Sequence, residues 1–117
     1  MKITLTNPYK EMKKDELIAL FERDLDKLIA EIKLYKKEEN IWRVEKNISN
    51  SAGNLTLHLI GNLHTFIGKE IGKTDYVRDR ELEFSQQNVS RQKLITAINE
   101  TLEMLKNSLS SITSGLN

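Results

Sequence analysis

The only two histidines of the chain, His58 and His64, lie in the apolar stretch NLTLHLIGNLH at residues 54–64. Imidazole is the side chain that most readily binds a metal ion or transfers a proton near neutral pH. If the stretch is helical, the two rings lie about 120° apart around the axis and about 9 Å apart along it. One helix therefore cannot direct both rings at one ion. Their spacing alone favours two structural histidines, and a ligand at one of the positions is the alternative.

Four of the five glycines, namely Gly53, Gly61, Gly68 and Gly72, lie in the same segment or at its ends. A glycine inside a helix costs about 1 kcal/mol relative to alanine, so Gly61 and Gly68 should have a compensating use. They are seven residues apart and share one face. This favours close packing of a neighbouring helix over contact with a ligand. Gly72 is predicted to be the C-cap of the helix.

Charged residues are dense in the stretch DYVRDRELEF at residues 75–84. The favoured interpretation is a local ion-pair network that fixes this connection between two helices. In the functional alternative, Arg78 or Arg80 binds the anionic part of a substrate through its fork of N–H donors. Trp42 is expected to cover one end of the core and not to form a substrate platform, because an indole buries a large area. The members of the predicted network are Asp75, Arg78, Asp79, Arg80, Glu81 and Glu83.

Apolar residues spaced three and four apart predict the helices that position these groups. One such stripe runs from Ile18 to Tyr35 and another from Ile95 to Ile112. The segment between them is apolar around most of its circumference, which predicts burial on several sides. The fold class is therefore all-α, an antiparallel bundle in which the second connection is long enough to cross the bundle. The helices are expected near residues 8–37, 50–71 and 89–113, with Asn88 or Ser90 capping the third. Asn7-Pro8 is the predicted start of the first helix, and a separate turn before Asp15 is the alternative.

The composition fits one domain over residues 1–117, since 38% hydrophobic residues allow one modest core. The 18 Lys and Arg residues nearly balance 17 Asp and Glu residues and are interspersed with them, which argues against a nucleic-acid partner. No stretch approaches the roughly 18 apolar residues of a membrane span, and the start lacks the features of a signal peptide. The expected location is the cytoplasm. Without cysteine, any sulfur chemistry must use an external thiol.

Residues 47–85 resemble the DinB-like superfamily. The motifs that carry the resemblance are Asn54-Leu55, His58-Leu59, Gly61-Asn62-Leu63, Arg78-Asp79-Arg80 and Glu83-Phe84, and Trp42 also suits the family. The resemblance implies a four-helix bundle, often dimeric, that holds a nickel or zinc ion. The metal ligands would be one histidine of the second helix and a His-x-x-x-His pair of the fourth. His58 matches the first ligand, and Asn62, Arg78 and Arg80 are the candidate substrate-binding residues.

The chain departs from the family pattern at its end, where it has no His-x-x-x-His pair and stops where the fourth helix is expected. Either the chain is a fragment or this helix has been lost. The resemblance implies a metal-dependent transferase that joins a low-molecular-weight thiol to an electrophile, although this chain alone is expected to be inactive. The alternative is a non-catalytic helical module that dimerises through the seam left by the fourth helix.

Two expectations follow for the structure. The first is a homodimer, because a second copy would cover the seam that a missing fourth helix leaves on the middle helix. The second is that His58, and not His64, faces the bundle interior or a cleft, with Asn62 beside it one turn on.

Overall fold

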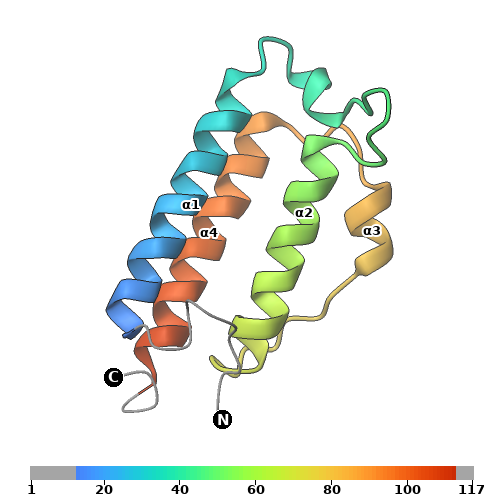
Figure 1. Ribbon diagram of the computed structural model, residues 1–117. Coiled ribbons are helices and arrows are strands. Elements are labelled where there is room, and N and C mark those ends of the chain that lie inside the picture. Colours follow the sequence, from blue (N-terminus) through green and yellow to red (C-terminus); the bar gives the residue numbers. More distant parts are fainter. Residues whose placement is uncertain (1–12, 113–117) are drawn as a thin grey trace.

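The computed structural model describes residues 13–112, which form an all-α helical bundle (Figure 1). Three long helices make up the bundle: α1 (Lys14–Leu34), α2 (Ala52–Leu63) and α4 (Arg91–Ser110). The shorter elements are the 3₁₀ helix η2 (Glu38–Trp42), the π-helix η3 (His64–Lys69) and α3 (Arg80–Ser85). No strand occurs among the described residues.

All three predicted helices are present, and their ends lie within the predicted limits. The predicted start at Asn7-Pro8 lies outside the described residues. Ser51 caps α2, because its Oγ accepts a hydrogen bond from Asn54 N at 3.0 Å. Of the two candidate caps for α4, Ser90 is the one used, with Lys93 N donating to its Oγ at 3.2 Å. These caps satisfy backbone donors that the first turn of a helix leaves without partners.

The middle helix continues past Leu63 as the π-helix η3, which is a wider turn than an α-helix makes. The helix ends near Gly72, whose N–H donates to Ile67 O at 3.0 Å. The prediction that Gly72 is the C-cap of this helix is wrong, because the C-cap is Glu70 and the positive φ that follows, 59°, belongs to Lys73. A Cβ at Gly72 would collide with the side chain of Ser108. The glycine is therefore required by the close approach of α4.

The three long helices are not all antiparallel to one another. Helix α1 runs against both α2 and α4, but α2 and α4 run in the same direction (Figure 1). The predicted antiparallel arrangement fails for this pair because the connection at residues 70–90 returns along the whole length of α2 before α4 begins. The contacts between the two segments occur in the same order along both, as expected for parallel helices. Trp42, which precedes α2, contacts Val89, which precedes α4. Further along, His64 contacts Thr101, and Gly72 lies against Ser108.

The hydrophobic core is centred on α4, which contributes the largest share of the buried side chains. Trp42 covers one end of this core, as predicted, with its side chain only 6% exposed. Its indole Nε1 donates to Val89 O at 3.0 Å, and its ring lies so close to Gly53 that a Cβ there would be 2.6 Å from it. The buried cluster comprises Leu25, Ile32, Ile41, Trp42, Ile60, Leu94, Ile95, Ile98 and Leu105.

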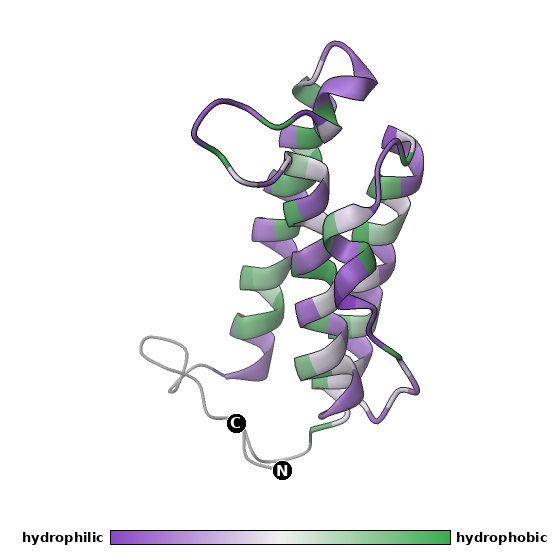
Figure 2. Cartoon of the chain, turned by 90° about the vertical axis from the view of Figure 1, so that its right-hand side faces the viewer, coloured by the Kyte–Doolittle hydropathy of each residue, from purple (hydrophilic) through white to green (hydrophobic). Residues whose placement is uncertain are grey.

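One apolar stripe of the middle helix is uncovered in the part of the chain that the structure describes. Leu55, Leu59 and Phe66 are 48%, 38% and 61% exposed. Leu55 and Leu59 line a groove of about 250 Å³ between α2 and α1, together with Leu28 and Tyr35. In Figure 2, hydrophobic and hydrophilic residues alternate along the helices, as in amphipathic helices generally. Within residues 13–112, no helix has the length and apolar character needed to cross a membrane.

Candidate functional site

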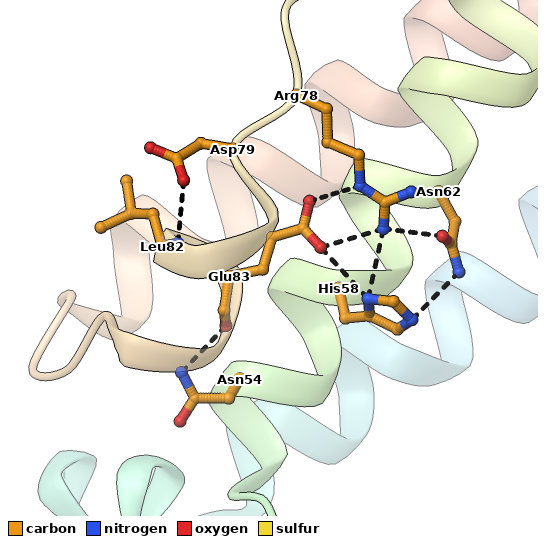
Figure 3. Close-up of polar contacts among 7 residues, drawn as sticks. All are labelled: Asn54, His58, Asn62, Arg78, Asp79, Leu82 and Glu83. Atoms are coloured by element: carbon orange, nitrogen blue, oxygen red, sulfur yellow. Dashed lines mark hydrogen bonds and ion pairs between the residues drawn. The ribbon is translucent and has the colours of Figure 1, made fainter.

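Helix α3 is held against α2 by a buried asparagine. The Nδ2 of Asn54 donates to two carbonyl groups at the end of α3, Glu83 O at 3.0 Å and Gln86 O at 2.8 Å. Ser51 orients this amide, because its hydroxyl donates to Asn54 Oδ1 at 2.6 Å. At the other end of α3, Asp79 Oδ1 accepts from Leu82 N at 3.0 Å and acts as the N-cap (Figure 3). Both ends of this six-residue helix are therefore fixed by side chains.

Arg78 and Glu83 form a two-pronged ion pair over the surface of α2 (Figure 3). Arg78 Nε donates to Glu83 Oε2 at 2.9 Å, and Arg78 Nη2 donates to Glu83 Oε1 at 2.9 Å. The side chains are only 11% and 7% exposed. This pair confirms part of the predicted ion-pair network. Arg80 is exposed and lies outside the pair.

His58 lies beside this ion pair, and its contacts determine which ring nitrogen carries the proton. Arg78 Nη2 donates to Asn62 Oδ1 at 2.7 Å, which turns the Asn62 Nδ2 donor toward His58 Nε2 at 3.4 Å. His58 Nδ1 lies 3.1 Å from Glu83 Oε1, which can only accept. Arg78 Nη2 also lies 3.2 Å from His58 Nδ1, but its two hydrogens are taken by Asn62 Oδ1 and Glu83 Oε1. The assignment that fits these contacts places the proton on Nδ1, toward Glu83, and leaves Nε2 with a lone pair that faces Asn62 Nδ2. The ring also lies 4.9 Å from that of Phe84, between centroids.

Gly61 makes this arrangement possible. A Cβ at this position would collide with Glu83 Oε2 and lie 3.2 Å from Arg78 Nε. Gly68, on the same face, lies against Met104 of α4, whose Sδ would be 2.9 Å from an added Cβ. The prediction that these two glycines allow close packing of neighbouring helices is confirmed. At Gly61, the packed groups are charged side chains.

His64 lies at the interface between the middle helix and α4. Its Nε2 is 3.1 Å from Thr101 Oγ1, and that hydroxyl donates to Ala97 O at 2.7 Å. Because the hydroxyl proton is already used, His64 Nε2 must be the donor. The ring stacks on Tyr76 at 4.8 Å with 21° between the planes. The two histidines point to different neighbours, as their spacing predicted, but the expectation that only His58 faces inward does not hold.

Burial and the ion pair shift the protonation equilibria of these groups. Burial alone would raise the pKa of Glu83, but hydrogen bonds from Arg78 and His58 outweigh it and hold the pKa below its usual value. Hydrogen bonding to Glu83 raises the pKa of Arg78. Burial lowers the pKa of His64, against an opposing effect of Glu100. Near neutral pH the site therefore contains a charged Arg78–Glu83 pair, and His64 is neutral.

Of the four residues that the sequence singled out, the structure brings His58, Asn62 and Arg78 together and leaves Arg80 outside their contacts. Sequence reasoning did not identify Glu83 as the partner of His58 or Asn54 as the anchor of α3. A polar Asn54 within an apolar run was the available signal for the second. Residues 13–112 contain no cluster of three or more His, Cys, Asp or Glu side chains that could hold a metal ion.

Three comparisons with known proteins identified one family. No curated protein and no solved structure matched the chain. One protein family matched residues 5–115, which is nearly the whole sequence and includes every element described above. The chain therefore belongs to the family described as proteins of unknown function (DUF1572).

Proposed function

We propose that this protein is a DinB-like, divalent-metal-dependent protein in which His58 supplies one ligand to a nickel or zinc ion. The supporting observation is the contact between His58 Nδ1 and Glu83 Oε1 at 3.1 Å. Metal-binding histidines usually donate their second ring N–H to a carboxylate or carbonyl, which fixes the ring and its tautomer. Here that leaves Nε2, on a side chain 29% exposed, as the nitrogen that can bind a metal.

The described residues alone do not fit a complete metal site. Zinc sites need three or four protein ligands, and His58 is a single ligand. The remaining ligands would have to come from outside residues 13–112. In this proposal they would lie over the uncovered stripe, since Leu55 lies one turn from His58 on the same side of α2. A helix that covers Leu55 and Phe66 would approach His58 Nε2.

The activity proposed for the completed site is transfer of a low-molecular-weight thiol to an electrophile. A bound metal would supply activation of the thiol. Among the residues described, Asn62 is the donor nearest to Nε2, and exposed Arg80 is the second candidate for substrate contact. Arg78 has a different role in this proposal. Its charge is balanced by Glu83, so it orients Asn62 and His58 instead of attracting an anion.

Metal analysis of the protein expressed from its complete gene tests this proposal. We expect about one nickel or zinc ion per chain, and loss of most of it in His58→Ala. His64→Ala is the matched control, because that imidazole is bonded to Thr101 and should leave the metal content unchanged. Equal metal content in the wild type and His58→Ala would rule out the ligand role.

A second candidate function is a non-catalytic, cytoplasmic binding module that forms a homodimer. The observation that favours it is the exposed stripe of Leu55, Leu59 and Phe66 beside the groove with α1. Exposed apolar patches of this kind are typical of interaction surfaces. Sedimentation equilibrium at micromolar concentration should give a dimer, and Leu59→Lys should give a folded monomer. A wild-type monomer that does not aggregate would contradict this candidate.

A further inference from the structure

A second cavity lies on a different side of α2 from the groove described above. It has a volume of about 360 Å³ and lies between α2, the residues just before α3, and α3 itself. Leu57, which lines it, is about 160° around the helix from Leu55. The volume falls within the usual range for small-molecule sites. The apolar lining consists of Leu57, Ile60, Val77, Leu82 and Val89.

The polar groups of this cavity are acidic or neutral. They are Tyr76, Asp79, Glu83 and Gln86, and no Lys, Arg or His side chain is among the lining residues. Glu83 is engaged with Arg78 and His58. Asp79 uses Oδ1 to cap α3, and its other carboxylate oxygen points away from that bond (Figure 3). Asp79 is thus the lining carboxylate that has an oxygen to offer a ligand.

The electrostatic environment of Tyr76 agrees with this charge distribution. Burial raises the pKa of its hydroxyl, and the negative charges of Glu83 and Asp79 raise it further, while Arg78 lowers it. Tyr76 therefore remains a neutral phenol that can donate or accept one hydrogen bond. An apolar wall with one carboxylate at its edge complements a ligand that has an apolar body and a cationic end.

We propose that this cavity binds a small amphiphile whose apolar part packs on Leu57, Val77 and Leu82 and whose protonated amine pairs with Asp79. The proposal is independent of a metal at His58, because Leu57 and Asp79 take no part in the contacts of that ring. The proposal also gives a reason for the exposed apolar side chains around α3. The Arg78–Glu83 ion pair and the helix caps do not need these side chains. Val77 and Leu82 are 85% and 48% exposed.

Titration of the ¹⁵N-labelled chain with 2-phenylethylammonium, followed by NMR, tests the proposal. We expect amide shifts centred on Val77 and Leu82. Matched ligands separate charge from apolar contact: 3-phenylpropionate should bind about tenfold more weakly, and the neutral 2-phenylethanol should be intermediate. Asp79→Asn keeps an N-cap but removes the charge. It should weaken ammonium binding about tenfold and leave alcohol binding unchanged.

Two variants check that the cavity itself is the binding site. Leu82→Ala should weaken both the ammonium and the alcohol, whereas Leu34→Ala, at an exposed leucine at the end of α1, should weaken neither. Equal or tighter binding of the carboxylate would overturn the proposal. So would shifts centred on the α1–α2 groove, or no shifts at millimolar ligand concentration in a chain whose spectrum shows that it is folded.

Discussion

At the scale of single residues, the polar contacts of the site converge on Glu83. Its carboxylate accepts two hydrogen bonds from Arg78 and one from His58, and its carbonyl accepts one from Asn54. Glu83→Gln keeps the shape of the side chain but leaves the Arg78 charge unbalanced. We expect it to lower the free energy of unfolding by about 2 kcal/mol, the usual size for hydrogen bonds to charged groups.

Urea denaturation at neutral pH measures this change as a lower midpoint with an unchanged slope. Glu81→Gln, on the exposed side of the same short helix, is the control and should change the free energy of unfolding by less than about 0.5 kcal/mol. If both variants had the same midpoint as the wild type, the ion pair would contribute nothing to stability.

His64 should make stability depend on pH in mildly acidic solution. Burial lowers its pKa in the folded state, so the unfolded chain takes up the proton first as the pH falls. Stability is therefore greatest above the unfolded pKa of about 6.5 and decreases as the pH falls from there through the folded pKa. Thermal unfolding between pH 7.5 and 5 should show this loss. His64→Gln should reduce it, and an unchanged pH profile in that variant would contradict the assignment.

At the scale of the elements, Gly61 connects α2 to α3. Gly61→Ala gains about 1 kcal/mol of helix propensity, but its Cβ meets Glu83 Oε2, so we expect a net loss of stability. Removing the obstructing side chain should reverse the sign. In a Glu83→Ala background, Gly61→Ala should stabilise the chain by up to about 1 kcal/mol. The four unfolding free energies form a double-mutant cycle, and additive values would show that the two residues do not interact.

Helix positions could be predicted from the sequence better than helix directions or partners. The stripes beginning at Ile18 and Ile95 each fill one face of a helix, so periodicity alone located α1 and α4. Periodicity carries no information on direction, and the parallel pairing of α2 with α4 depends on how residues 70–90 pack. The contact between His58 and Glu83 joins residues 25 positions apart. Gly61 was the only hint of this contact in the sequence. A glycine inside a helix indicates that a neighbouring group comes close, but it does not show that the group is Glu83.

At the scale of the whole molecule, α4 connects the other elements. Helix α1 and the middle helix both pack on it, whereas α1 and α2 leave a groove between them. The apolar run of the middle helix predicted burial on several sides. Within residues 13–112 it is covered by α4, by α3 and, at its start, by Trp42 of η2. The sequence could show that the middle helix has more apolar residues than one buried face would hold. It could not indicate what, if anything, covers them, because no element among residues 13–112 packs over Leu55, Leu59 and Phe66.

The two ends of the described chain lie next to each other. Lys14 Nζ donates to Ile112 O at 2.9 Å, where the first turn of α1 meets the end of α4. The bundle is therefore nearly a closed loop, and we expect its packing not to depend on chain order. A circular permutant that joins these ends with a short glycine-rich linker and opens the exposed segment at residues 43–49 should keep the native helical content. Circular dichroism would measure this, and a permutant without helical structure would show that the original chain order is required.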